Sequence, residues 1–472
     1  MTRRSFVVAF IIALAGCAGV RKAAPPEAAV DVPSGWRASG VQGPDVSATW
    51  WTAFDDQQLV SLVAEALARS DDIALAATRV EQARAQFRFA QAQRLPAVDL
   101  SVAGGRERTI NPGFGVPEEQ TAGQGLIEAS FDVDLFGRLK SGSQAARSAL
   151  LASEYARDTV RLSVATSVVS GYVSLLALDA RRDILHKTLE VRRNELHAEE
   201  QRFNAGYSAQ LELAQAQTEV AASEQSIPAI ELAITRQENG LSILVGRLPG
   251  EITRGTFEAL NLPKIPSAVP ATVLRSRPDL AAAEARLAAT DHNLDAARAA
   301  FLPDIQLGIT DGAIRSTLVD ASPVGIWSIG GSILAPIFEA GRLQAQQDAA
   351  TAQRDEAAFA YRKAALEAFG EVENELTAVT RDAEQEDAVR RERDALERTL
   401  RLATRRYREG YANYLDQLDA QRNLLSAQLA LVQARLDRFN AAASLCQALG
   451  GGWKPDPAAG TLADNHPNAG QD

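Results

Sequence analysis

The chain has 472 residues, of which 46% are apolar and 23% charged, and its formal net charge is -11. This composition is typical of an ordered protein with a substantial core, and the acidic balance argues against a nucleic-acid partner. Length alone favours about three domains, but an internal duplication can overturn that estimate.

Residues 1–16 are predicted to form a secretory signal peptide. Two arginines precede an apolar run over residues 6–14, which is too short to span a bilayer as a mature helix. The run ends in LAGC, which resembles the lipobox of bacterial lipoproteins, where the cysteine becomes acylated after cleavage. We therefore expect a covalent lipid, such as palmitate, on Cys17 and no other cofactor. The alternative is an ordinary signal with a chance cysteine.

The second cysteine, Cys446, lies in the apolar context AASLCQALG. Its only possible intramolecular partner is Cys17, so lipidation would leave it without one. We predict a packed, unreactive thiol.

The chain is predicted to be a duplication of about 205 residues, because three markers recur in the same order. A stretch from Asp72 is identical at nine of 29 positions to one from Asp279. The motif FGRL at Phe136 recurs as FEAGRL at Phe338. The third marker is FNAGYSAQLELAQAQ from Phe203, which returns 204 residues later as YREGYANYLDQLDAQ.

Each half is predicted to have the same plan. An Ala-rich helix, about 59–94 or 271–300, ends at a Leu-Pro pair, since proline cannot continue a helix. Two strands follow, and then a long helix over 139–201 or 343–405, which no proline interrupts. Apolar residues that recur at sevens predict coiled-coil packing of these helices. Shorter helices return over about 209–244 and 414–449.

The four predicted strands alternate apolar and polar residues, as in Val98, Leu100 and Val102 with Asp99 and Ser101 between them. The third and fourth strands lie around 305–310 and 327–333, and the second around 128–135. An amphipathic sheet that covers the helices is one interpretation. A sheet at the helix ends whose apolar face meets lipid must instead close into a barrel, and four strands are too few to enclose a lumen. The second interpretation predicts a homo-oligomer.

The predicted domain organisation follows from these segments. It comprises the signal peptide at 1–16, a lipid-anchored linker at 17–50, a first repeat at 51–248, an equatorial segment at 249–269, a second repeat at 270–453 and a disordered tail at 454–472. The fold class is mainly α with a small β part.

The chain resembles the outer-membrane factors, which are TolC/OprM-like channels, and in particular the NodT-type efflux lipoproteins. The segments that carry the resemblance are WWTAFDDQQL from Trp50, DVDLFGRL from Asp132, SRPDLAAAEARL from Ser276, FLPDIQL from Phe301, LAPIFEAGRL from Leu334, AFGEVENEL from Ala368 and ALGGGW from Ala448. The resemblance implies a homotrimer with a 12-stranded barrel in the outer membrane and a helical tunnel that extends into the periplasm. It also implies a periplasmic adaptor (membrane fusion) protein, an RND-type inner-membrane pump, and multidrug efflux.

The resemblance also implies site residues. The hairpin turns, with Gly206, Tyr207, Gly410 and Tyr411, would lie where the adaptor docks. The entrance gate would comprise Asp416 and Asp419, which share one helix face, together with Tyr407. The arginine that some family members use for closure is replaced by Ala412.

Alternatives remain open for two of these sets. Asp416 also fits the first turn of a helix capped by Asn413, and the two turn tyrosines could pack against a neighbouring hairpin instead of the adaptor. We expect no enzymatic activity, because the four histidines show no metal-ligand spacing and no nucleophile motif is present. Acids in EVENE at Glu371 and EQED at Glu384 are predicted to be solvated helix faces.

The predicted function is the exit duct of a tripartite efflux system that exports small molecules across the outer membrane. The alternatives are an outer-membrane duct for type I protein secretion and a lipid-anchored periplasmic coiled-coil scaffold without a pore.

Overall fold

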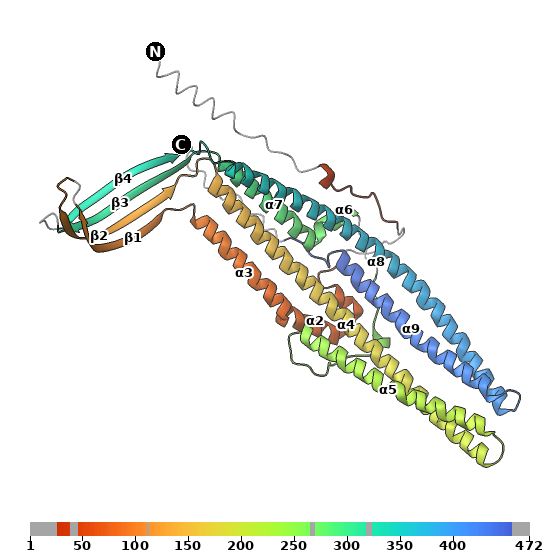
Figure 1. The fold of residues 1–472 in the computed structure, drawn as a ribbon. Coiled ribbons are helices and arrows are strands. Elements are labelled where there is room, and N and C mark those ends of the chain that lie inside the picture. The colour runs from red at the N-terminus through yellow and green to blue at the C-terminus, as the bar shows by residue number, and fades with distance from the viewer. Residues whose placement is uncertain (1–25, 38–45, 111–112, 265–269, 318–322, 456–472) are drawn as a thin grey trace. The chain divides into compact units, whose positions relative to one another are not determined.

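A computed structural model describes residues 26–37, 46–110, 113–264, 270–317 and 323–455, and Figure 1 shows its ribbon. The elements in chain order are η1 (Pro26–Ala28), η2 (Trp50–Phe54), α2 (Gln57–Arg69), α3 (Asp71–Ala92), β1 (Ala97–Ile110), β2 (Pro117–Asp132), α4 (Arg138–Asn204), α5 (Gln210–Leu244), η3 (Phe257–Ala259), α6 (Pro270–Ser276), α7 (Pro278–Ala299), β3 (Asp304–Ser316), β4 (Val324–Leu334), α8 (Arg342–Arg408) and α9 (Tyr414–Ala448). The predicted lipidation site, Cys17, and nearly all of the predicted tail lie outside the described residues.

The long helices repeat with a fixed offset. Both α4 and α8 have 67 residues, and both α5 and α9 have 35. Each helix of the second pair begins 204 residues after its counterpart in the first. The helices of each pair lie side by side in Figure 1, and we call α4 with α5 the first hairpin and α8 with α9 the second hairpin. The predicted long helices and their returning partners are confirmed.

The two Ala-rich helices are each broken, contrary to the prediction of one continuous helix. The first breaks at Ser70, whose ψ of 129° is not helical. Helix α3 then starts with two acidic residues. The second breaks at Arg277, because the residue before a proline is driven out of the helical region and Pro278 opens α7.

The four strands form one antiparallel sheet in the order β1-β2-β3-β4. One cross-strand row joins Val98, Ala129, Ile309 and Ile329, and the next row joins Asp99, Glu128, Thr310 and Ser328. The alternation predicted from the sequence therefore produces one apolar face and one polar face. The second strand ends at Asp132, earlier than predicted, so Val133 and Leu135 fall outside it.

The apolar face of the sheet is exposed in this chain. Val98, Leu100, Trp327 and Ile329 each retain between 67% and 77% of their surface. The first and last strands each have one edge without a partner strand among the described residues. The sheet is thus unfinished in a single chain, both on its face and at its edges.

Contacts divide the chain into two compact units, each with segments from both halves of the duplication. The first unit comprises Met1–Ala29, Arg79–Glu154 and Ala282–Lys363, and it holds the whole sheet. The second unit comprises Val30–Thr78, Tyr155–Ala281 and Ala364–Asp472, and it holds both hairpin turns.

The core of the second unit surrounds the middle of α4. Buried residues from Val164 to Ala177 pack with Phe54, the start of α2 and Phe439 of α9. The predicted equatorial segment joins this core, because Phe257 is buried and its ring centroid lies 5.9 Å from that of Phe439. Burial of such side chains contributes roughly 1.5–3 kcal/mol each.

One described helix, α4, is long and apolar enough to cross a membrane by length and composition. Its apolar stretch coincides with the buried residues of the second unit's core. The hydrophobicity of α4 is therefore accounted for by packing inside the protein.

Two smaller predictions have different outcomes. Cys446 is buried, and burial raises the pKa of its thiol to about 12, as expected for an unreactive packed cysteine. The solvated-face prediction for EQED is wrong at Glu386, which is 4% exposed and is paired with Arg390 and Arg438. A buried acid of this kind is retained because arginines balance its charge.

Candidate functional site

The two hairpin turns have the same backbone geometry. Gly206 and Gly410 both have a φ of +80°, a region that residues with a side chain rarely adopt. The amide of the following tyrosine donates to the carbonyl five residues back, from Tyr207 to Arg202 at 2.8 Å and from Tyr411 to Arg406 at 2.8 Å. This pattern ends a helix and reverses the chain. Both glycines therefore lie in the hairpin turns, as predicted.

The tyrosines after these glycines point away from the chain's own core. Tyr207 is 80% exposed and Tyr411 is 74% exposed. Neither ring packs on a hairpin of the same chain, so both are available to another chain. A tyrosine can supply a large apolar area and a polar tip in such a contact.

Tyr407 links the two hairpins near their turns. Its ring is 7% exposed, and its hydroxyl donates to Glu199 of α4 at 2.7 Å. Ser208 donates to the other carboxylate oxygen at 2.9 Å, and the Arg202 guanidinium lies over the tyrosine ring at 4.7 Å. Burial raises the pKa of Tyr407, and the bond to Glu199 adds to this effect, so the phenol stays protonated and remains a donor.

A second link lies farther from the turns. Glu195 of α4 accepts from Gln417 at 2.8 Å and from Gln421 at 2.5 Å, both on α9. Burial raises the pKa of this carboxyl, although the two amides lower it. Its protonation state therefore affects the contact between the hairpins.

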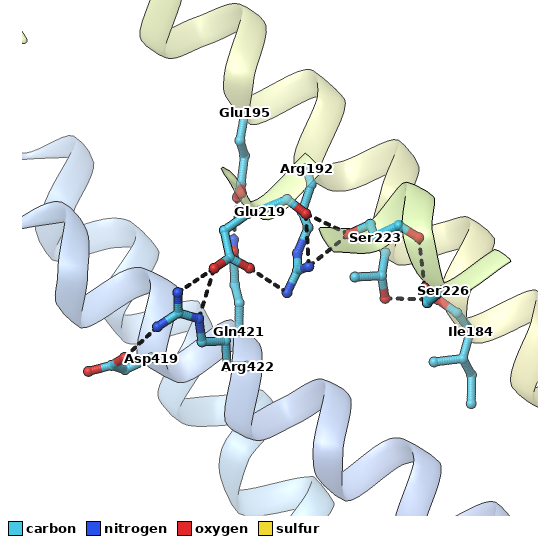
Figure 2. Close-up of polar contacts among 10 residues, drawn as sticks. Ile184, Arg192, Glu195, Glu219, Ser223, Ser226, Asp419, Gln421 and Arg422 are labelled. Carbon is cyan, nitrogen blue, oxygen red and sulfur yellow. Dashed lines mark hydrogen bonds and ion pairs between the residues drawn. The ribbon is translucent and has the colours of Figure 1, made fainter. Parts of the chain in front are cut away.

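A third link is a cluster of charges around Glu219 of α5 (Figure 2). One carboxylate oxygen lies 2.9 Å from Arg192 of α4, and the other accepts from Arg422 of α9 at 2.9 Å. Arg192 also donates to Ser223 at 2.7 Å. Both Glu219 and Arg192 are buried, so removal of one partner would leave an uncompensated charge in the interior.

The predicted gate acids lie on the exposed side of α9. Asp416 and Asp419 are both exposed, whereas Gln417 and Leu418 between them are buried. The Asp416 amide donates to the side chain of Asn413 at 2.9 Å, so the capping interpretation holds for its backbone. Its carboxylate remains available for a further role. Asp419 lies 3.6 Å from Arg422, which connects it to the Glu219 cluster.

Tyr407 and the two acids lie in one region beside the turn at Gly410, but the tyrosine is buried and the acids are exposed. Tyr407 is an internal contact, and the acids face outward. No group of three or more His, Cys, Asp or Glu residues suited to a metal ion occurs within the described ranges. The arrangement can attract cations and hold the two hairpins together.

Most partners in these three links were not predicted from the sequence. They are Arg192, Glu195, Glu199, Glu219, Gln417, Gln421 and Arg422. A signal was present, because Arg192 and Glu199 occupy the buried seam of α4 that Leu189 and Leu196 also line. A charge on an apolar seam predicts a buried partner.

Comparison with known proteins decides the family. The sequence matches the family described as outer membrane efflux protein over residues 62–247 and 269–451. The chain belongs to the outer membrane efflux protein family. It is 36% identical over 446 residues to the pyoverdine export outer membrane protein OpmQ of Pseudomonas putida, a match that covers 92% of this chain and 94% of the relative. The toluene efflux pump outer membrane protein TtgC of P. putida is 33% identical, with 95% and 94% coverage.

Solved structures of this kind share the fold. The Campylobacter jejuni outer membrane channel CmeC has a TM-score of 0.85 at 26% identity, and the match covers 92% of this chain and 95% of that one. The channel CusC has a TM-score of 0.79 at 30% identity, with 91% and 99% coverage. The four-stranded sheet and long helical hairpins are therefore those of an outer-membrane efflux channel, and this protein is located in the outer membrane.

Proposed function

We propose that three copies of this chain form the exit duct of a tripartite efflux system. The observation that carries the proposal is the unfinished sheet, with its exposed apolar face and its two open edge strands. Backbone groups at an open edge cannot be satisfied inside a bilayer, so the sheet must close with other strands. Three chains with four strands each supply enough strands to surround a water-filled lumen.

The hairpin turns are the proposed docking sites for a periplasmic adaptor protein, which in turn joins an RND-type inner-membrane pump. Tyr207 and Tyr411 support this role, because both rings are exposed at the turns and unused by the chain itself. The glycines before them fix how the tyrosines are presented.

The gate is proposed to have two parts. The bond from Tyr407 to Glu199 holds the second hairpin against the first, and Asp416 and Asp419 place two carboxylates per chain at the entrance. Three chains would bring six carboxylates around one axis, where they attract cations and repel one another when the entrance narrows. Ala412 contributes no charge, so closure depends on the links described above.

Cys17 is proposed to carry a covalent lipid that anchors the N-terminus in the outer membrane. The LAGC sequence supports this, and a single acyl chain adds to the membrane affinity that the sheet already provides. Metabolic labelling with palmitate is expected to mark the protein with the unaltered sequence. Equal labelling of a Cys17→Ser variant would disprove the assignment.

The cargo is proposed to be small molecules that the pump selects. Relatives with similar identity carry different names, for pyoverdine export, toluene efflux and cation efflux. A passive duct with few binding groups is consistent with such variety. These relatives favour efflux over protein secretion.

The entrance acids are tested by Asp416→Asn with Asp419→Asn in purified protein reconstituted in planar bilayers. We expect the ratio of cation to anion permeability to fall by about twofold or more, and block by divalent cations to weaken. The matched control is Glu190→Gln, an exposed acid of α4 away from the turns, which should leave both quantities unchanged. Unaltered selectivity in the double variant would rule out the carboxylate ring.

A further inference from the structure

An exposed stripe of arginines runs along the last turns of α8. Arg398, Arg401, Arg405 and Arg408 are spaced three or four residues apart and therefore share one helix face, and all are exposed. Leu402 lies among them and is 61% exposed. We call these five residues the arginine stripe.

The charges of the stripe are only partly used by the chain. Arg401 pairs with Glu397 at 3.3 Å, and Arg408 is close enough to Glu195 to lower the pKa of that carboxyl. Within the described part of the chain, the side chains of Arg398 and Arg405 make no hydrogen bond or ion pair. Two exposed guanidinium groups thus flank an exposed leucine without a partner.

The first hairpin has no such stripe, although it is built to the same plan. The positions 204 residues earlier are occupied by Asn194, His197, Ala198, Gln201 and Asn204. These are exposed or lie at the turn, and none carries a fixed positive charge. A partner that contacts both hairpins would therefore meet a strongly basic surface only on the second.

We propose that the arginine stripe is a docking surface for an acidic helical face of the periplasmic adaptor. This inference rests on the proposed function, which places the adaptor at the hairpin turns. Arginine beside an exposed apolar side chain is a composition enriched at the centres of protein interfaces. Guanidinium groups form paired hydrogen bonds with carboxylates, so the partner's face must carry Asp or Glu at helical spacing.

A second copy of this chain fits the stripe less well. The exposed positions of α5 nearest its turn are Gln210, Leu211, Ala214, Gln217 and Thr218, which are all uncharged. The exposed acids at the start of α9 belong to the entrance constriction in the proposed function. Charge complementarity therefore favours the adaptor.

The test places the photo-crosslinker p-benzoylphenylalanine at position 402 of the full chain in its native cells. Three backgrounds are compared: the unaltered protein, Arg398→Gln with Arg405→Gln, and Arg398→Lys with Arg405→Lys. We expect an adduct with the periplasmic adaptor, identified by mass spectrometry, whose cross-linked segment is helical and has a net negative charge. The glutamine background should reduce the adduct about fivefold or more, since charge steers such encounters, and the lysine background should retain most of it.

The control places the same crosslinker at position 198, the counterpart of Leu402 on the first hairpin, where the arginine substitutions should change nothing. An adduct with a second copy of this chain would overturn the proposal, as would a cross-linked segment without net negative charge, equal adducts in the glutamine background, or no adduct at all. Conductance of the glutamine variant in bilayers is measured in parallel and should be unchanged. If the unaltered protein forms no pore, the proposed duct function is refuted. An acidic partner cross-linked at the stripe would still support the docking surface.

Discussion

The Tyr407 hydroxyl joins the two hairpins directly, next to their turns. It joins a side chain that is 7% exposed to Glu199, which is 3% exposed. Water has little access to either group, so separation of the hairpins requires this bond to break before the carboxylate can be hydrated. A hydrogen bond to a buried charged group contributes about 1.5–3 kcal/mol, which is enough to bias a two-state gate.

Tyr407→Phe is predicted to weaken closure, because the ring remains and only the hydroxyl is lost. In planar bilayers the variant should spend more time in conducting states than the unaltered protein. Tyr411→Phe is the matched control, since that tyrosine is 74% exposed, and it should have no effect. The double variant Glu199→Gln with Tyr407→Phe should increase the time in conducting states by less than the sum of the two single increases. Full additivity would mean that the two groups do not act through one bond.

Glu195 is predicted to make the contact between the hairpins sensitive to pH. Burial raises the pKa of its carboxyl despite the amides of Gln417 and Gln421. A carboxyl with a higher pKa in the folded protein than in the unfolded chain favours folding at acid pH and loses this contribution as pH rises through the raised value. Stability linked to this group is therefore lower near neutral pH than in mild acid.

Glu195→Gln removes the titrating proton and keeps an oxygen that both amides can reach. Thermal unfolding should shift to higher temperature near neutral pH, and the difference between mild acid and neutral pH should shrink. Glu190→Gln, at an exposed position of the same helix, should leave the pH profile unchanged. A pH profile unaffected by Glu195→Gln would show that this carboxyl is not the sensor.

Some residue roles were accessible from the sequence, and others were not. The place of Gly206 and Gly410 in the hairpin turns was predicted correctly, because a repeated glycine between two helices has few structural explanations. The ion pairs of Glu219 with Arg192 and Arg422 were not predicted. These arginines lie on other helices, 27 and 203 residues from Glu219 in the chain. Periodicity identifies a seam but does not identify the partner across it.

At the scale of elements, the sequence predicted the long helices and missed two breaks. Both α4 and α8 were predicted within a few residues, since no proline interrupts them and apolar residues recur at sevens. The break at Ser70 depends on one extended residue inside an Ala-rich segment. The break at Arg277 could have been predicted from Pro278, which restricts the residue before it.

The close approach of β2 and β3 depends on Gly312. A Cβ added at this position would lie 2.1 Å from the carbonyl oxygen of Gly125 and 2.9 Å from the Cα of Leu126. Gly312→Ala must therefore push the two strands apart, and overpacking of this kind typically costs about 1–3 kcal/mol. The thermal stability of the assembled protein should decrease.

Gly308→Ala is the control for this effect, because it lies on the same strand and a Cβ there meets nothing within 4 Å. Its thermal midpoint should stay close to that of the unaltered protein. Equal midpoints for Gly312→Ala and the unaltered protein would show that strands β2 and β3 can separate without cost.

At the scale of the whole molecule, the sheet and the hairpins have different partners in the proposed assembly. The sheet, in the first unit, has no partner strand at either edge within the described ranges. The turns, in the second unit, display two exposed tyrosines, and the arginine stripe lies beside one of them. The sequence predicted the need for an oligomer from the alternation of four strands. It could not show that the arginines at the end of α8 are exposed and only partly paired, because exposure and pairing depend on the folded chain.

The central claim is that three copies of this chain together form one pore. Native mass spectrometry and single-channel recording on the same purified, detergent-solubilised sample test it most directly. We expect a mass of three chains and discrete conducting events after insertion of that species into a planar bilayer. A monomer as the conducting species, or a trimer that inserts without conducting even with Tyr407→Phe, would contradict it.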